Sequence, residues 1–250
     1  KMDIMDTKGK EYLAKQVLSV YEAFFGTTNY PPYKIVVSAS IFEERLKLCA
    51  NWMERQSIQN KKIEIEKLNG LMVEPKENGG MFYLLVAEKR FLDQISYIGT
   101  VAHEFTHILD FSQYFDVEKI AELRSINNPN YDFIHFYSEV RARYRGMLLS
   151  WSLQQVTSID KGEFYGLVKQ YESILKEQWD LYFVAQFYGQ YLAAKAIDRD
   201  FSIPIPAYLG ESIRKLLDLL SIHINDKSIY DSYDEIKKAF DDYKKINGDI

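Results

Sequence analysis

Hydrophobic side chains recur every three or four residues near the start of the chain, which predicts an amphipathic helix. Gly26 and the following Pro31 and Pro32 predict that this helix ends at the glycine. A second helix is predicted after Ser40, which stands three residues before Glu43 as in a capping box. The hydrophobic positions of the first helix are Leu13, Val17, Val20, Tyr21 and Phe24, and those of the second are Phe42, Leu46, Cys49, Trp52 and Met53.

Three segments of the N-terminal part have the pattern of strands. The β-branched segment Tyr33–Ser38 predicts a short buried strand. Between residues 63 and 73, hydrophobic and charged side chains alternate, and Asn69 with Gly70 predicts a hairpin turn in the middle. Residues 81–87 predict the last strand. We therefore expect a small mixed sheet of about four strands.

Helical periodicity dominates the second half of the chain, and strand patterns almost vanish after residue 115. The longest helix is expected at 133–155, after a loop at 127–130 with the sequence NNPN. Other helices are expected at 117–125, 164–175, 179–197, 213–222 and 233–246. The expected fold is α+β and mostly helical, with an α+β lobe at 1–115 and a helical lobe at 116–250 that together form one folding unit.

Composition narrows the classes of partner and compartment. The net charge of −5 argues against nucleic acid as the main partner, because phosphate contacts require a basic field. No run of about 18 apolar residues occurs, so we expect no membrane span. The single cysteine, Cys49, cannot form an internal disulfide and is expected to pack in the core. Together with the absence of an apolar signal segment at the N-terminus, this favours a cytoplasmic protein.

Residues 98–111, IGTVAHEFTHILDF, contain the pattern His-Glu-x-x-His on a predicted helix for which Asp93 is the expected N-cap. Helical rotation of about 100° per residue places His103 and His107 one turn apart on one face, where both imidazoles can reach one Zn²⁺. Glu104 projects beside that face, which suits a carboxylate that takes a proton from an activated water. The flanking positions are hydrophobic, as in a buried helix with one polar strip: Val101, Ala102, Phe105, Ile108 and Leu109.

The motif has an alternative interpretation without a metal. In it, the two histidines lie at the edge of the core and donate to backbone carbonyls, and Glu104 is in solvent. If the motif binds catalytic zinc, a third protein ligand is needed, and a fourth position stays open for water. A metzincin would have a glycine and a third histidine where this chain has Asp110 and Gln113, so this subclass is excluded.

With these residues the chain resembles the gluzincin group of zinc metallopeptidases, in which a glutamate on a later helix completes the site. The matching segment, SEVRA at 138–142, makes Glu139 the third ligand by this resemblance. Some gluzincins carry an Asp one turn after that glutamate to orient a zinc histidine, whereas this chain has Arg143 there, so Asp110 is expected to take that role. The resemblance implies a zincin-like fold with the site between two lobes, and it does not extend to the last hundred residues.

The residues themselves leave alternatives open. Glu139 could instead be an ordinary helix residue paired with Arg143, with another residue as the third ligand. The alternative ligands are Glu118, Glu122 and His135. Tyr131 and His135 are candidate donors to a developing oxyanion. His223, near the end of a predicted helix, is expected to pack or to cap that helix, and Arg141, Arg143 and Arg145 are expected to form a solvated, charge-paired face.

The expected function is a zinc-dependent metallopeptidase in which His103, His107 and Glu139 hold Zn²⁺ and Glu104 is the general base. A peptide or protein substrate would add as a strand to residues 81–87, if these form the edge of the sheet. One alternative is a catalytically inactive zincin-like binding or regulatory module, as in a mobile genetic element. Another is hydrolysis of a non-peptide amide, which uses the same activation of water.

Overall fold

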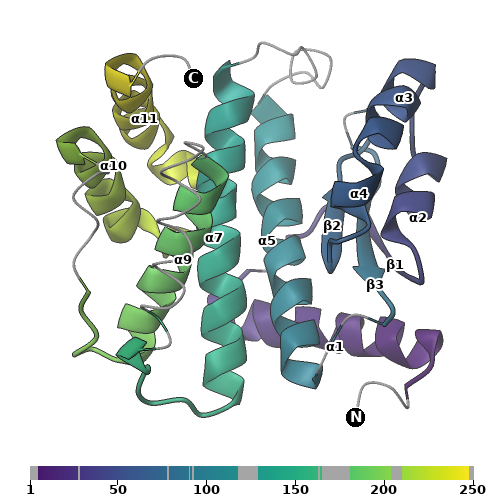
Figure 1. Ribbon diagram of the computed structural model, residues 1–250, viewed down its shortest axis with the longest axis horizontal. Helices are drawn as coiled ribbons and strands as arrows, with labels where there is room; N and C mark the ends of the chain where they lie inside the picture. The colour runs from purple at the N-terminus through teal and green to yellow at the C-terminus, as the bar shows by residue number, and fades with distance from the viewer. Residues whose placement is uncertain are drawn as a thin grey trace. The chain divides into compact units, whose positions relative to one another are not determined.

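A computed structural model of the 250-residue chain describes all residues except 1–4, 28, 78, 90, 92, 118–128, 163, 165–180, 204–209 and 248–250. The chain forms two compact units, Lys1–Glu122 and Leu123–Ile250. The first contains helices and a small mixed sheet, and the second is helical in its described part (Figure 1). The α+β, mostly helical class expected from the sequence is confirmed.

The first helix, α1 (Thr7–Phe25), ends at Gly26 as predicted, and its start at Thr7 is fixed by a cap that was not predicted. The Asp6 side chain accepts a hydrogen bond from the Gly9 backbone N–H, and Gly26 ends the helix with a positive φ of 67°. Glycine adopts this left-handed conformation without steric cost, which explains its position here. The expected hydrophobic face is only partly correct, because Val17 and Tyr21 are buried whereas Val20 and Phe24 are exposed.

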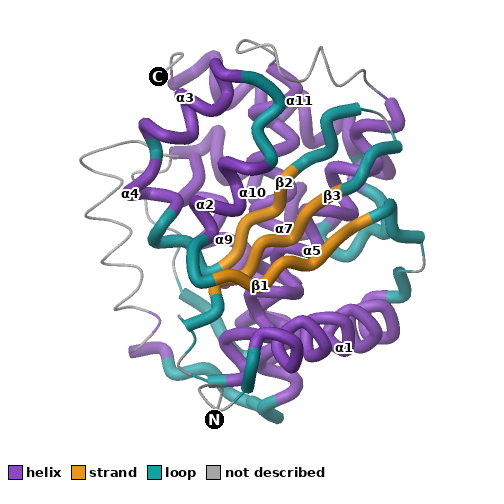
Figure 2. Tube along the Cα trace, turned by 90° about the vertical axis from the view of Figure 1, so that its right-hand side faces the viewer, coloured by secondary structure: helices purple, strands orange, loops and turns teal. Residues whose placement is uncertain are grey.

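Among the described residues the sheet has three strands in the order β1-β3-β2, instead of the four that were expected. β1 (Tyr33–Ser38) pairs in parallel with β3 (Phe82–Ala87), and β2 (Gly70–Val73) pairs antiparallel with the other side of β3 (Figure 2). Strand addition at residues 81–87 required these residues to form the edge of the sheet, and this condition is not met because β3 is the central strand. The edge next to the His-Glu-x-x-His helix is β2.

Two further expectations for this unit are wrong. The predicted second helix is two helices, α2 (Ile41–Lys47) and α3 (Trp52–Asn60), because Asn51 accepts a hydrogen bond from the Glu54 N–H and starts a new helix. Ser40 caps α2 as predicted, but Cys49 is half-buried between the helices, and Trp52 and Met53 are 76% and 61% exposed.

The segment predicted as the first strand of a hairpin is instead one turn of helix, α4 (Lys62–Ile65), and Gly70 begins β2 instead of forming a turn. Ile65 is buried and Ile63 is exposed. An alternating pattern over four residues fits one helical turn as well as a strand, so periodicity could not separate the two.

Helix α5 (Gln94–Val117) carries the His-Glu-x-x-His motif and is anchored within the first unit. Asp93 caps it as predicted, since its Oδ1 accepts a hydrogen bond from the Ser96 N–H at 2.7 Å. The Tyr21 hydroxyl is 2.8 Å from the Thr106 hydroxyl, which joins α1 to the turn that carries the motif. Helix α5 also lies against β2 and β3 (Figure 1). The hydrophobic positions that flank the motif are buried, as expected: Val101, Ala102, Phe105, Ile108 and Leu109.

The second unit contains α7 (Pro129–Leu153), α9 (Leu181–Ile197), α10 (Gly210–His223) and α11 (Tyr233–Asn247), with a 3₁₀ turn at Ile229–Asp231. These helices confirm the predictions at 133–155, 179–197, 213–222 and 233–246 within a few residues. Pro129 and Asn130 belong to α7 and not to the expected loop, because proline is tolerated in the first turn of a helix. The helices predicted at 117–125 and 164–175 lie outside the described residues, except Val117 at the end of α5 and Phe164.

Helices α7 and α9 approach each other closely at Gly189. A Cβ atom there would lie 2.5 Å from the Val140 carbonyl oxygen, so only glycine permits this approach. Within the described ranges, no helix combines the length and the hydrophobicity that crossing a membrane requires.

Candidate metal centre

The two histidines of the motif direct their ring nitrogens toward each other. The Nε2 atoms of His103 and His107 are 3.0 Å apart, and the rings meet at 81° with centroids 4.7 Å apart. Zinc binds imidazole nitrogen at about 2.0–2.1 Å, so two nitrogens on one tetrahedral ion lie about 3.3 Å apart. The observed spacing therefore suits two ligands of a single ion.

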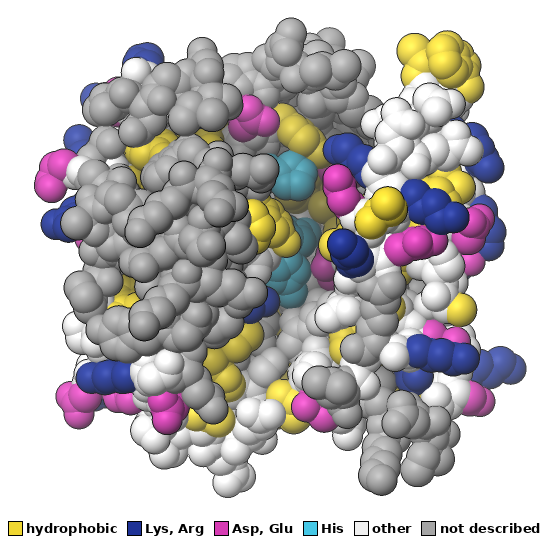
Figure 3. Space-filling view, viewed as in Figure 1, with side chains coloured by type: hydrophobic (Ala, Val, Ile, Leu, Met, Phe, Trp, Pro, Cys, Tyr) yellow, Lys and Arg dark blue, Asp and Glu magenta, His cyan; other side chains and the backbone are white. Residues whose placement is uncertain are grey.

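Burial differs between the two rings. His107 is buried and packs against Phe111 one turn further along α5, with ring centroids 6.3 Å apart. His103 is only partly buried, and histidine side chains are visible from outside in the space-filling view (Figure 3). One ring is thus fixed by packing, while the other remains accessible to solvent.

Glu104 is held against the sheet. Its side chain is 7% exposed, and its Oε2 accepts a hydrogen bond from the Met72 backbone N–H at 2.7 Å. The alternative interpretation of Glu104 as a solvated residue is therefore wrong. Nothing in the sequence points to Met72, because a backbone donor leaves no signal in the identity of the side chain.

Glu139 lies on α7 in the second unit and is 6% exposed. Its Oε1 accepts a hydrogen bond from Gln186 Nε2 on α9, and the same amide lies 3.2 Å from the Tyr182 hydroxyl. Arg143, the expected partner of Glu139 if that residue had no special role, donates to Gln190 Oε1 at 3.0 Å. Gln186 was not predicted as a site residue, although a polar residue within a hydrophobic helical segment was a usable signal.

His103, His107 and Glu139 form a cluster that could hold a metal ion. One ligand atom from each of the three residues lies within 4.8 Å of those of the other two. Two imidazoles and one carboxylate are a donor set that catalytic zinc uses in proteins. The residues present therefore fit the metal that the sequence motif implies.

The other candidates occupy different positions. Asp110 is fully buried on α5, and the His135 ring is exposed with its Nε2 3.1 Å from the Tyr131 hydroxyl. His223 Nδ1 is 2.8 Å from Asp226 Oδ2, so its ring contacts a side-chain carboxylate, and its expected packing or capping role stays a prediction. Glu118 and Glu122 lie outside the described residues.

The expected solvated arginine face is wrong for two of its three members. Arg141 is fully buried and Arg145 is 2% exposed, and both donate to the backbone oxygen of Asp226. These arginines join α7 to the segment between α10 and α11. They stabilise the second unit because each satisfies a backbone acceptor that precedes the 3₁₀ turn.

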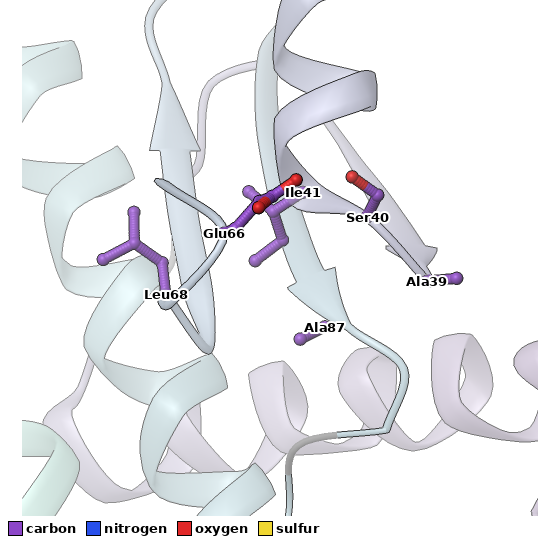
Figure 4. A pocket seen from close by; sticks show the side chains of 6 residues that line it. All are labelled: Ala39, Ser40, Ile41, Glu66, Leu68 and Ala87. Atoms are coloured by element: carbon purple, nitrogen blue, oxygen red, sulfur yellow. The ribbon is translucent and has the colours of Figure 1, made fainter. Parts of the chain in front are cut away.

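A pocket of about 150 Å³ lies elsewhere in the first unit, at the ends of β1 and β3 (Figure 4). Ser40 already caps α2 there through its hydroxyl. The lining residues are Ala39, Ser40, Ile41, Glu66, Leu68 and Ala87. None of them belongs to the histidine motif, so the pocket is separate from the candidate metal centre.

Comparison with known proteins gives no relative from which a function could be transferred: no family model, no curated protein and no solved structure matches the chain.

Proposed function

We propose that the protein is a zinc-dependent metallopeptidase with a zincin-like arrangement of its first unit. The observation that carries the proposal is that the Nε2 atoms of His103 and His107 on α5 are 3.0 Å apart. The buried Glu104, which follows His103 in the sequence, is on the same helix. The Glu139 carboxylate supports it as the third ligand. In this proposal His103, His107 and Glu139 hold Zn²⁺.

When bound, zinc would lower the pKa of a water molecule and polarise the scissile carbonyl. Glu104 would take a proton from the attacking water and deliver it to the leaving amine, as a general base and then a general acid. The Met72 N–H limits the positions of the Glu104 carboxylate, and Gln186 does the same for Glu139. Packing against Phe111 keeps the His107 ring in place.

The proposed substrate is an extended segment of peptide or protein. Strand addition at residues 81–87 is ruled out because β3 is paired on both sides, so we assign this role to β2. An edge strand offers backbone donors and acceptors that a peptide can pair with regardless of its sequence. Residues Gly70–Val73 lie against the same helix that carries Glu104, which would bring an added strand close to the reacting groups.

The test combines zinc binding with hydrolysis of fluorescein-labelled casein, an unstructured protein. Wild type should bind one zinc ion and cleave casein, whereas Glu104→Gln should bind zinc equally well and lose about 10²–10⁴-fold in turnover. Full activity in Glu104→Gln would refute the role of this residue. Zinc binding without cleavage of casein or of a peptide library would refute the peptidase and favour a binding module.

A further inference from the structure

The proposed catalytic residue makes a hydrogen bond to the edge of the sheet. Glu104 Oε2 accepts the Met72 N–H at 2.7 Å, and Met72 lies in the middle of β2. The Glu104 carboxylate therefore accepts the Met72 N–H at the position where an added strand would place a backbone carbonyl oxygen.

The pairing of β2 with β3 explains why this N–H faces outward. The Ala87 N–H donates to the Asn69 oxygen, and hydrogen-bonded pairs alternate along an antiparallel ladder. Leu71 is thus in a bonded pair with β3. Gly70 and Met72 direct their backbone groups toward the opposite edge, at the two-residue spacing with which an extended peptide would pair.

Gly70 permits the close approach of this edge to α5. A Cβ atom at Gly70 would lie 2.8 Å from Thr100 Cγ2 and 2.9 Å from Glu104 Cγ. The side chain of Glu104 therefore passes directly over the backbone of β2. A peptide that pairs with Met72 would have to displace the carboxylate from the N–H that it now occupies.

We infer that the Met72 N–H is a shared donor: it holds Glu104 in the protein without substrate, and it is transferred to a backbone carbonyl of an extended peptide when the substrate binds. The exchange releases one Glu104 oxygen from the sheet as the substrate arrives, so that the base is available when there is a bond to cleave. This inference rests on the proposed function. It adds that substrate and base compete for one hydrogen-bond donor.

The competition predicts that removal of the catalytic carboxylate strengthens binding of the substrate. Fluorescein-labelled casein would be titrated by fluorescence anisotropy with the full chain stripped of metal by EDTA, so that no cleavage occurs. Glu104→Ala should bind casein about two- to tenfold more tightly than wild type, the effect of one hydrogen bond that no longer has to be displaced.

Met72→Pro completes a double-mutant cycle with Glu104→Ala. Proline removes the N–H but is tolerated at an outward-facing position of an edge strand. In the Met72→Pro background, Glu104→Ala should give no gain in affinity for casein, and Met72→Pro alone should weaken binding. Met72→Ala, which keeps the N–H, measures what the side chain contributes. Equal affinity of wild type and Glu104→Ala, or a gain that persists with proline present, would overturn the inference.

Amide hydrogen exchange tests the contact itself without any ligand. The Met72 N–H should exchange about tenfold faster in Glu104→Ala than in wild type, while the Leu71 N–H, bonded within the sheet, should be unchanged. An unchanged rate at Met72 would overturn the inference even if Met72→Pro does not fold. If no variant binds casein but zinc-loaded wild type cleaves it, the inference fails and the peptidase stands. If the affinities of the double-mutant cycle are as expected and zinc-loaded wild type cleaves nothing, the peptidase fails and the shared donor stands.

Discussion

Replacing Gly189 with alanine should push α9 away from α7 and disturb the support of Glu139. The new Cβ atom would lie 2.5 Å from the Val140 oxygen, 2.8 Å from Arg143 Cβ and 3.0 Å from the Tyr144 nitrogen. Two of these three atoms belong to the backbone of α7 and cannot rotate aside. Because a carbon–oxygen contact needs about 3.3 Å, α9 must move by about 0.8 Å.

Two opposing contributions set the change in the free energy of unfolding. Forcing an extra methyl group into a packed contact costs about 1–3 kcal/mol. Alanine in a helix interior is about 1 kcal/mol more favourable than glycine. The expected net loss is about 1 kcal/mol, with an upper limit near 2 kcal/mol. Urea denaturation followed by far-UV circular dichroism measures it, and faster hydrogen exchange in peptides from α7 and α9 would assign the loss to the second unit.

Gly9→Ala is the matched control, because the nearest atom to its new Cβ is the flexible Met5 Cγ at 2.6 Å. This variant should be as stable as wild type or slightly more stable. A shift of α9 should also weaken the contact from Gln186 to Glu139 and lower zinc affinity about tenfold, the lower end of the effect of outer-shell partners. If Gly189→Ala is stabilised like the control and keeps its zinc affinity, the reasoning about this contact is wrong.

Three more outcomes are expected. Gln186→Ala should lower zinc affinity about 10–100-fold, whereas Gln190→Ala, on the same helix but bonded to Arg143, should leave it within about twofold in competition titrations. Zinc at about 100 times its Kd should stabilise wild type by about 2.7 kcal/mol, and His107→Ala should abolish this gain in thermal melts. Asp93→Ala should cost about 1 kcal/mol at neutral pH through loss of the N-cap. The hydrogen bond from Ser96 holds the Asp93 pKa below 3.8, so in urea titrations this difference should be full above that pH and vanish as the pH falls through the lowered pKa.

Elements whose pattern is local could be predicted from the sequence. β1 was predicted with its observed bounds, and the end of α1 and the start of α5 follow from Gly26 and Asp93, each of which acts within a few residues. The spacing of His103 and His107 is equally local, because i and i+4 meet on any helix. These predictions needed no knowledge of the fold.

The expected arginine face depended on distant partners, and it was wrong for two of its three members. Arg141 and Arg145 have the composition of a solvated face, yet both are buried and donate to the Asp226 backbone oxygen, more than 80 residues away in sequence. The order of strands likewise depends on how the segments between them cross the sheet. The unbroken hydrophobic run in β3 was nevertheless a signal for a central strand, since a strand buried on both faces lacks alternation.

The two carboxylates of the proposed centre share a feature that the sequence motif does not encode. Each accepts a hydrogen bond from an uncharged donor: a backbone N–H for Glu104 and a side-chain amide for Glu139. A neutral donor orients a carboxylate without contributing a positive charge that would repel a cation nearby. Arg143 lies one turn from Glu139, and it donates to Gln190, whose neighbour one turn back is Gln186. Gln190 thus binds the guanidinium of Arg143, while Gln186 binds the Glu139 carboxylate, so in the proposed centre the amide of Gln186 would orient Glu139 without adding a positive charge.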